Sequence, residues 1–474
     1  MLSKRLYRAA FVAGLMLIGL LGSATRSSAQ MSFLGVGAPA ASAEGIGSLA
    51  YDDKHHVYLH VYDASRMVWG RFLDSNGTPI GAPFAIGTYR ISYSNTGKVA
   101  YSRGSGADVF FVAYTSDANC YDSCANVFGA LVQYTGAAPS GGGVASGVIP
   151  ISPYSTVANP KQISNDVAFN PLNSRFMVAY NELAYTGNAD VNVRLFNADG
   201  SAATAPVNVS PGTCAQGSAA LSFDWQRNYF MVVYSGDHPQ GDPSCPSRTS
   251  NWGSFGYLLE GNGGTPITGL LVLESGFSYE PAVTYLPEAD GFLTAWTRVT
   301  GERDVVGRFV SSASGGLGTP YGVMATPGRN EGYSTLEYDP ASRKVLVAAM
   351  RDPNVIGGAI LNAGGGVELP AFGMSTVAAG LGSFYPVLER AEGGVLGVHY
   401  NVNFVASYVE RFALPPSGAP GPTLGGGGGG GGGCGQSCNP HAMVNIDAPG
   451  NGATVGNPFA LTGWFRTDCE TRQF

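Results

Sequence analysis

Three carboxylates are the residues of this sequence whose type and setting could support bond cleavage. Glu280, Asp304 and Glu331 each lie beside aromatic or basic residues at the edge of a short apolar run. Paired carboxylates hydrolyse glycosidic bonds when their carboxyl groups stand about 5 to 9.5 Å apart. Because the three are far apart in the sequence, only a fold could bring them together. No G-x-S-x-G, H-E-x-x-H or phosphate-binding glycine motif is present, so no catalytic residue is assigned beyond these candidates.

A second group of residues has the chemistry of a binding surface. Aromatic rings beside carboxylates, amides and guanidinium groups are what a sugar or a peptide site requires. The candidates of this kind are Asp166, Tyr279, Arg298, Tyr333, Tyr385 and Trp252. The alternative is that the rings pack beneath loops and the charges are solvated.

The histidines and the acidic turns could suggest a metal, but the pattern favours simpler roles. His55, His56 and His60 form an H-H-x3-H cluster, and residues at even spacing share one face of a strand. The first two fall in an expected turn, however, and we assign no Asp or Glu pair to join them as ligands. The turns 74–77 and 197–200 resemble calcium loops only superficially, since Asn-Gly and Asp-Gly supply hairpin turns. We therefore predict no metal and no other cofactor.

Seven cysteines are present. In an exported chain they favour disulfides. We predict the pairs Cys120–Cys124 and Cys214–Cys245, with Cys434–Cys438 as a further candidate pair. The alternative for Cys120-x3-Cys124 is a metal site, but no histidine stands next to it.

The elements that must position these residues belong to a repeat. A short apolar run recurs seven times, at 49–51, 99–101, 167–169, 221–223, 283–285, 336–338 and 387–389. A second, almost wholly apolar run follows each of them, as in 176–181 and 230–235. A third, more polar run comes next and ends in a turn, and a fourth follows that turn, as in 79–86 and 266–273. Val, Tyr, Phe and Thr dominate the runs, which is typical of strands.

Four short strands in a unit of about 50 residues are typical of one blade of a β-propeller. We therefore predict an all-β, seven-bladed β-propeller over residues 32–414. The last copy ends after its third run, at 405–412, while an unassigned apolar stretch stands at 33–40. We expect that stretch to supply the outer strand of the last blade and so close the ring. The alternative is an N-terminus that pairs with nothing.

This geometry sorts the loops onto two faces. Loops between strands one and two, and between three and four, lie on the first face and are short, as at 170–175 and 339–344. Loops between strands two and three, and between blades, lie on the second face and are longer, as at 116–126 and 235–254. Long loops on a rigid scaffold usually carry binding residues. The second face is therefore the predicted working surface.

The beginning of the sequence has the features of a secretory signal, which we assign to residues 1–29. Lys4, Arg5 and Arg8 precede the apolar run 9–22, and small residues at 27–29 offer a cleavage site. No later stretch is long and apolar enough to cross a bilayer. The net charge of −7 with no basic stripe argues against nucleic acid as a partner. We expect a secreted, extracellular or periplasmic, soluble monomer.

The composition changes after residue 414. Residues 415–433 are rich in Pro and Gly and end in the glycine run Gly425–Gly433, which is typical of a flexible linker. The stretch 446–464, IDAPGNGATVGNPFALTGW, resembles the opening of bacterial immunoglobulin-like modules. A complete module of that kind needs about 100 residues. We therefore expect 434–474 to be a truncated, largely disordered Ig-like module, by truncation or by a shift of reading frame.

The repeats also resemble a known group. The pattern F-x-V-A-Y/W followed by D-V-x-G-R-x-F, carried by FLTAW at 292–296 and DVVGRF at 304–309, is similar to that of uncharacterised secreted bacterial seven-bladed β-propeller repeat proteins. The resemblance implies the fold and not a chemistry. Our functional prediction is a secreted, non-catalytic binding propeller for an extracellular polysaccharide or protein. The alternative is a polysaccharide hydrolase or lyase with its site at the mouth of the channel.

Overall fold

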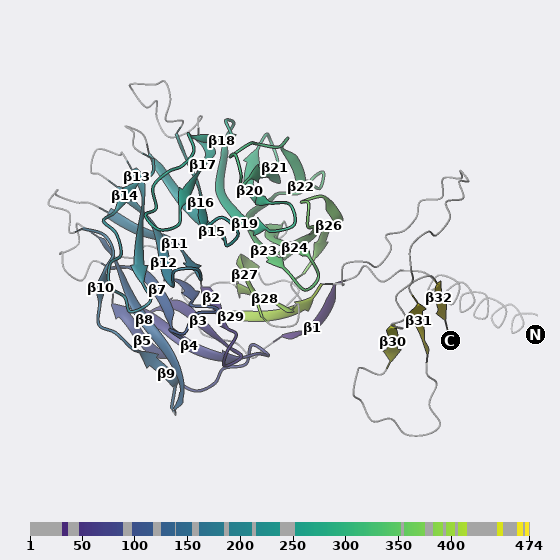
Figure 1. The fold of residues 1–474 in the computed structure, drawn as a ribbon, viewed down its shortest axis with the longest axis horizontal. Helices are drawn as coiled ribbons and strands as arrows, with labels where there is room; N and C mark the ends of the chain where they lie inside the picture. Colours follow the sequence, from purple (N-terminus) through teal and green to yellow (C-terminus); the bar gives the residue numbers. More distant parts are fainter. Residues whose placement is uncertain are drawn as a thin grey trace, which may run out of the picture. The chain divides into compact units, whose positions relative to one another are not determined.

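A computed structural model gives the three-dimensional structure of the chain. It describes residues 31–36, 47–88, 97–116, 125–137, 139–153, 161–183, 189–210, 215–237, 252–351, 355–374, 383–391, 395–402, 406–414, 443–448, 462–467 and 470–473. The chain divides into two compact units, Met1–Ala419 and Pro420–Phe474. The first unit holds seven β-sheets, six of them built from strands that are consecutive in the chain, and Figure 1 shows these sheets arranged around one centre. The predicted all-β, seven-bladed β-propeller is confirmed.

Each blade is an antiparallel sheet whose first strand lies innermost. Blade 1 contains β2 (Ser48–Asp52), β3 (Val57–Ala64), β4 (Met67–Asp74) and β5 (Phe84–Thr88). Blade 2 contains β6 (Lys98–Tyr101), β7 (Phe110–Ser116) and β8 (Asn126–Ala137), and two short strands, β9 (Gly141–Val144) and β10 (Ile149–Pro150), share its outer edge. Blade 3 contains β11 (Lys161–Asn170), β12 (Arg175–Leu183), β13 (Ala189–Asn197) and β14 (Val207–Asn208).

The remaining blades follow the same order. Blade 4 contains β15 (Gln216–Asp224), β16 (Tyr229–Asp237), β17 (Trp252–Glu260) and β18 (Leu271–Glu274). Blade 5 contains β19 (Ser278–Leu286), β20 (Gly291–Val299), β21 (Arg303–Ser311) and β22 (Tyr321–Met324). Blade 6 contains β23 (Glu331–Asp339), β24 (Lys344–Arg351), β25 (Val355–Asn362) and β26 (Val367–Gly373). Blade 7 contains β27 (Ser383–Arg390), β28 (Val395–Val402), β29 (Ala406–Ala413) and, at its edge, β1 (Ser32–Val36).

The ring is closed by the start of the described chain. β1 pairs antiparallel with β29, with Ser32 opposite Ala413 and Val36 opposite Glu410. The rings of Phe33 and Phe412 lie 5.6 Å apart between centroids. The expected outer strand of the last blade is therefore confirmed. Its paired part is Ser32–Val36, whereas residues 37–46 lie outside the described residues.

The second strand of each blade carries most of the core because both of its faces are covered by neighbouring blades. In β16, Phe230, Met231, Val232 and Val233 are all fully buried, and in β20 Trp296 is fully buried as well. Burial of side chains of this size stabilises a fold by about 1.5 to 3 kcal/mol each. The stacking of blades therefore holds the ring together, as the repeat predicts.

Two details of the repeat differ from the sequence-based assignment. In blades 6 and 7 the inner strand is irregular between Gly332 and Thr335 and between Phe384 and Val387, so Val387 corresponds to Thr335. The seventh copy of the first run is thus 388–390, one residue later than expected. The fourth run is also interrupted: Pro79 and Pro266 make single bridges, and the strands begin only at Phe84 and Leu271. Proline cannot donate to a strand ladder.

The turn at 74–77 is a hairpin connection. The Gly77 amide donates to the Asp74 carbonyl (2.9 Å), and Gly77 has a φ of 78°. The Asp74 carboxylate accepts from the amides of Asn76 and Thr78 at 2.8 and 2.9 Å. That carboxylate is used by its own turn, in agreement with the hairpin interpretation.

The second unit contains one antiparallel sheet of β30 (Met443–Ala448), β31 (Thr462–Thr467) and β32 (Glu470–Gln473). Its assignment to an Ig-like module stays a prediction. The signal segment 1–29, the linker 415–433 and the predicted disulfide cysteines lie outside the described residues. Among the residues that are described, none belongs to a helix with the length and apolarity to span a membrane.

Candidate functional site

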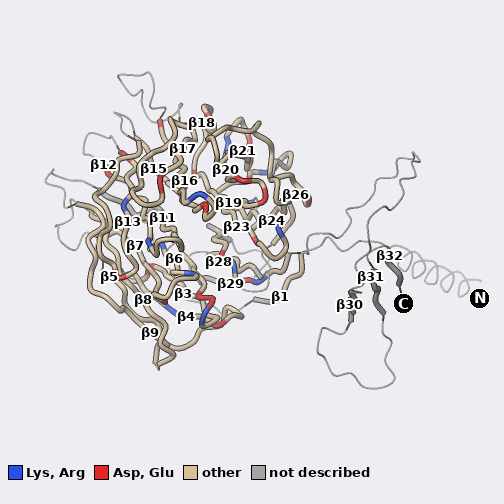
Figure 2. Tube along the Cα trace, in the orientation of Figure 1, with Lys and Arg blue, Asp and Glu red and all other residues tan. Residues whose placement is uncertain are grey.

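A cavity of about 580 Å³ lies on the axis of the ring and is lined by the inner strands of all seven blades. Small residues form much of its wall, including Ala50, Ala100, Ala220 and Ala282. We call the end at which the inner strands begin the bulge end, and the end carrying Arg103, Pro171, Trp225 and Pro340 the loop end. The bulge end is on the predicted working face and the loop end is on the opposite face. Charged residues are sparse overall, but several lie close to the centre of the ring (Figure 2).

The bulge end takes its name from a repeated irregularity of the inner strand. Strands β15, β19 and β23 each carry extra residues close to the end at which they begin. These residues lie between Gly217 and Ala220, Tyr279 and Ala282, and Gly332 and Thr335. One residue of each bulge, Ser218, Glu280 or Tyr333, has a φ of 51° to 55°. That conformation costs a non-glycine residue about 1 kcal/mol or more, and bulges re-aim side chains. The backbone of each bulge therefore sets the direction of the Glu280 and Tyr333 side chains.

Carboxyl groups from three blades are influenced by the charge of one ammonium group near the bulge end. The charge of Lys98, at the start of β6, favours the ionised forms of Asp63, Asp166 and Glu280. Burial acts in the opposite direction and dominates: it raises the pKa of Glu280 to about 8 and that of Asp63 to about 7, and it also raises the pKa of Asp166. The Asp166 carboxylate accepts from the Leu221 amide of the next blade at 2.7 Å. One Oε atom of Glu280 is enclosed without a hydrogen bond among the described residues.

Two of the predicted binding residues lie in contact. The rings of Tyr279 and Tyr333 pack edge to face with centroids 5.8 Å apart, and Phe277 lies 6.0 Å from Tyr279 on the other side. Trp252 begins β17 opposite Asp237, farther from the axis. Tyr385 falls in the bulge of β27, and its side chain is outside what the structure describes. Blades 5 and 6 thus present an aromatic group beside Glu280.

The three candidate catalytic carboxylates have different settings. Glu331 is fully buried, and its carboxylate accepts from the Thr326 amide (3.0 Å) and hydroxyl (2.8 Å) and pairs with Arg351 (3.0 Å). Asp304 is on β21, the third strand of its blade, so its strand lies about 10 Å from that of Glu280. It stands opposite Arg298, which pairs with Glu274 at 3.7 Å. No contact among the described residues joins these three carboxylates into one site.

The loop end holds a charged group that the sequence analysis did not single out. Glu337 and Glu389 occupy corresponding positions on the inner strands of blades 6 and 7 and both line the cavity. Arg103 of blade 2 pairs with Glu389 (3.3 Å) and donates to the Arg390 carbonyl (3.0 Å). The Tyr51 amide also donates to Glu389, at 3.0 Å. Blades 1, 2 and 7 are tied together by this one carboxylate.

Two side chains in this group are left without a partner. Among the described residues, neither the Glu337 carboxyl nor the Arg390 guanidinium makes a hydrogen bond or an ion pair, although each feels the charge of the other. Burial, and next the charge of Glu389, raises the pKa of Glu337 to about 8. Burial also raises the pKa of Glu389, against the effect of Arg103. Near neutral pH the cavity therefore presents an acid that can donate and a guanidinium, next to the pair of Arg103 and Glu389.

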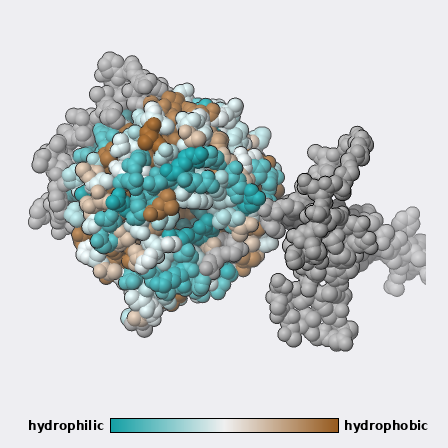
Figure 3. Space-filling view, in the orientation of Figure 1, coloured by the Kyte–Doolittle hydropathy of each residue, from teal (hydrophilic) through white to brown (hydrophobic). Residues whose placement is uncertain are grey.

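An exposed aromatic ring stands at the rim of the loop end. Trp225 lines the cavity, is 41% exposed and packs edge to face on Tyr285, with ring centroids 4.9 Å apart. Leu172, in the corresponding loop of blade 3, is 58% exposed. The face of the molecule drawn in Figure 3 is largely hydrophilic around its centre, with isolated apolar spots. An accessible ring beside unpartnered polar groups is the usual composition of a ligand site.

A sequence signal for the loop-end group did exist. The middle residue of the first run is Ala50, Ala100, Ala168, Ser222 or Thr284 in blades 1 to 5, but Glu337 in blade 6. A charged residue at a position where the other copies carry small residues stands out once the inner strand is known to face a channel. Glu389 was hidden by the one-residue shift of the seventh copy.

Comparisons with known proteins give structural similarity only. No family model matches the sequence, and no curated protein matches it. The Dos1 propeller has a TM-score of 0.45 and 10% identity, covering 82% of this chain and 96% of that chain. The Cps50 (Swd1) β-propeller domain of Myceliophteria thermophila has a TM-score of 0.46 and 8% identity, covering 80% and 99%. An exo-β-1,3-galactanase from Phanerochaete chrysosporium has a TM-score of 0.37 and 10% identity, covering 66% and 76%.

Proposed function

We propose that this protein is a secreted binding protein that takes the end of an extracellular polymer into the loop end of its channel. The observation that carries the proposal is the pair of unpartnered groups, Glu337 and Arg390, in a cavity of about 580 Å³. That volume is within the range of about 300 to 1,000 Å³ found for small-molecule sites. It suits a chain end or a side group, and it is too small for a folded domain.

The chemistry of the loop end favours a polysaccharide that carries carboxylates. A guanidinium binds a carboxylate through two parallel hydrogen bonds, and the Arg390 guanidinium has that capacity unused. A protonated Glu337 donates a hydrogen bond to a hydroxyl or carboxyl oxygen. The exposed ring of Trp225 offers an apolar face at the rim for a sugar ring. A peptide with a free C-terminus shares the carboxylate, and the test below separates the two ligands.

The test is binding of the full chain to a glycan array and to a peptide array. We expect signal on glycans containing uronic acids, and loss of at least tenfold in affinity for Arg390→Ala and for Trp225→Ala. Arg66→Gly is the matched control: it also removes one positive charge, Arg66 is exposed in the β3–β4 turn, and glycine suits its φ of 61°. Equal affinity of Arg390→Ala and the wild type would overturn the proposal. Signal on peptides alone would replace the polysaccharide with a protein partner.

A second candidate function is cleavage of a polysaccharide by a hydrolase or a lyase reaction. It is favoured by the two glutamates at corresponding positions of blades 6 and 7, of which Glu337 is held as an acid while Glu389 faces Arg103. General acid catalysis requires a carboxyl group that stays protonated near neutral pH. The candidate predicts release of reducing ends from a glycan that the array identifies, abolished in Glu337→Gln. Unchanged glycan after prolonged incubation with the wild type would exclude it.

Export is part of the proposal and rests on the sequence of residues 1–29. Expression of the full chain in a secreting host should yield a mature protein that begins at Gln30. Recovery of the chain with its original N-terminus from the cell interior would contradict it.

A further inference from the structure

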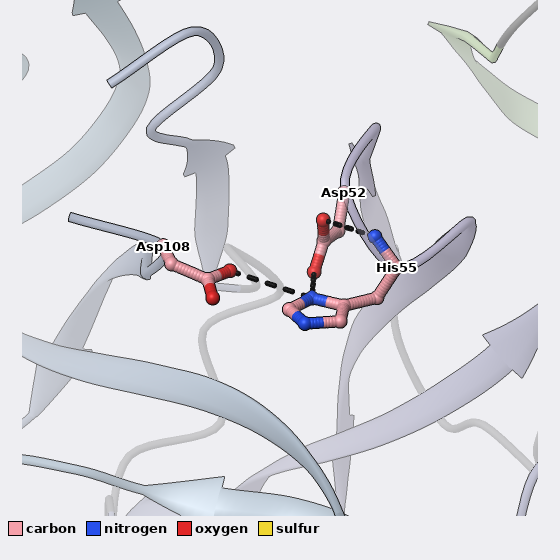
Figure 4. Close-up of side chains that lie close together, drawn as sticks. All are labelled: Asp52, His55 and Asp108. Atoms are coloured by element: carbon pink, nitrogen blue, oxygen red, sulfur yellow. Dashed lines mark hydrogen bonds and ion pairs between the residues drawn. The ribbon is translucent and has the colours of Figure 1, made fainter. Parts of the chain in front are cut away.

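Three potential metal ligands from two blades converge on the first face, at the outer side of the loop end. The His55 Nδ1 atom lies 2.7 Å from Asp52 Oδ2 and 3.4 Å from Asp108 Oδ1, and the three ligand atoms all lie within 4.8 Å of one another. Figure 4 shows the imidazole ring with its Nδ1 atom turned toward both carboxylates. This group was not predicted from the sequence, because Asp108 comes from the next blade.

The local fold fixes two of the three side chains. Asp52 ends β2, and its Oδ1 atom accepts from the amides of Lys54 and His55 at 2.9 and 3.0 Å. This turn brings the His55 ring back over the Asp52 carboxylate. Asp108 stands two residues before β7 and receives the Tyr101 hydroxyl on Oδ1 at 2.9 Å. Asp52 is thus held by backbone hydrogen bonds and Asp108 by a buried tyrosine.

We propose that Asp52, His55 and Asp108 form a binding site for a divalent transition metal of the Zn²⁺ type. A catalytic or structural zinc takes nitrogen and oxygen ligands at about 2.0 to 2.2 Å, and three protein ligands leave a position for water. Ligands at that distance from one ion lie about 3.3 Å apart in a tetrahedron, so the observed separations need only small adjustments. Two carboxylates balance the charge of a divalent ion, and the imidazole nitrogen selects zinc over the oxygen-seeking Ca²⁺ and Mg²⁺.

The hydrogen-bonding capacity of His55 also favours a ligand between the two carboxylates. The Nδ1 atom faces two carboxylate oxygens but can carry only one proton, so it can donate to only one of them. A metal ion at this point would satisfy both carboxylates and the imidazole at once. The side chain of Asp52 is 1% exposed while that of His55 is 30% exposed, so the group is open to solvent on the histidine side alone.

The ion pair between Lys54 and Asp108 has to break before a metal ion can bind. Lys54 Nζ lies 2.5 Å from Asp108 Oδ2, and the Lys54 side chain is 61% exposed. An exposed ion pair of this kind contributes about 0 to 1 kcal/mol, and a lysine side chain can turn into solvent without moving the backbone. Asp108 faces His55 with Oδ1 and Lys54 with Oδ2. The bound ion would therefore replace only the positive charge of the Lys54 ammonium group. Binding would link the first loop of blade 1 to the first loop of blade 2 and so stiffen the ring.

The experiment is a titration of the full chain with ZnCl₂, followed by calorimetry and by thermal unfolding. Saturation of this site should raise the unfolding temperature by several degrees, because a ligand bound only to the folded state stabilises it. His55→Gln and Asp108→Asn should each lower the affinity of this site at least tenfold. His56→Gln is the matched control, since His56 is the neighbouring exposed histidine and is not one of the three ligands.

Two outcomes would overturn the proposal. The first is equal zinc stoichiometry and affinity in the wild type, His55→Gln and Asp108→Asn, which would assign any bound zinc to other residues. The second is a thermal shift with CaCl₂ as large as the shift with ZnCl₂, which would exclude the imidazole as a ligand. If a variant fails to fold, crystals of the wild type soaked in ZnCl₂ decide: the proposal requires an anomalous peak in contact with all three side chains.

Discussion

The seam where the ring closes contains two histidines that should make the fold sensitive to acid. His60 of blade 1 and His399 of blade 7 are both fully buried, and their Nε2 atoms lie 3.0 Å apart. Their Nδ1 atoms have no partner among the described residues. One Nε2 donates and the other accepts, so the accepting ring must be neutral, and protonation of both rings would break the hydrogen bond. Protonation of either ring would place an unpaired charge inside the seam.

The magnitude follows from the shift in the folded state. Burial lowers the pKa of His399 from 6.5 to about 4. Burial, and next His399 and Arg71, lowers the pKa of His60 in the same direction. Because the folded pKa is below the unfolded one, the stabilisation is complete above pH 6.5 and is lost as the pH falls toward 4. A difference of about 2.5 pH units for His399 corresponds to about 3 kcal/mol of unfolding free energy.

The assay is urea unfolding at pH 7 and at pH 4.5. His60 corresponds to Val347 and His399 to Ala348 in the register of blade 6, so the double variant His60→Val/His399→Ala supplies residues that this fold already uses there. We expect its loss of stability between the two pH values to be smaller than that of the wild type by at least about 2.4 kcal/mol, which is the part of the His399 effect that falls between pH 7 and pH 4.5. His56→Gln, at an exposed position, should lose as much as the wild type. Equal losses in the wild type and the double variant would refute the reasoning.

Three other predictions concern the ring and its channel. Deletion of residues 31–36 leaves the outer edge of β29 unpaired and should lower the free energy of unfolding by about 2 to 4 kcal/mol, measured by urea unfolding, because several strand hydrogen bonds are lost; an unchanged midpoint would contradict closure by β1. Trp296→Ala removes a fully buried ring and should cost about 3 to 5 kcal/mol, measured the same way; a cost under 1 kcal/mol would contradict the packing of blade 5. Glu337→Gln should raise the unfolding temperature relative to the wild type at pH 8 but not at pH 4.5: the folded pKa is raised from 4.5 to about 8, so the wild type loses stability as the pH rises between those values. An equal effect at both pH values would show that Glu337 is not held as an acid.

The fold could be predicted because its evidence is local and repeated. Each apolar run, such as 176–181, is a strand by composition alone, and the period of about 50 residues fixes the number of strands in a blade. Ring closure could be predicted because the absence of a fourth run after 405–412 and a spare apolar stretch at 33–40 are both visible in the sequence. The fourth strands were placed less well, because Pro79 and Pro266 interrupt pairing where hydrophobicity continues.

The site could be predicted only in part, because its contacts join residues from different blades. Tyr279 and Tyr333 were both predicted for the binding surface, and they meet because they lie at the inner-strand bulges of neighbouring blades. The Arg103–Glu389 pair joins blade 2 to blade 7, and no local sequence pattern predicts it. The contacts of Glu331 could not be predicted either: its carboxylate pairs with Arg351 and accepts from the Thr326 hydroxyl.

The measurement that tests the account most directly is a crystal structure of the full chain with an acidic oligosaccharide chosen from the array. The account predicts electron density on the axis of the ring, with a sugar carboxylate in contact with the Arg390 guanidinium and a sugar ring against Trp225. A ligand found on the outer strands of the blades, or at the bulge end beside Tyr279 and Tyr333 with the loop end unchanged, would contradict it.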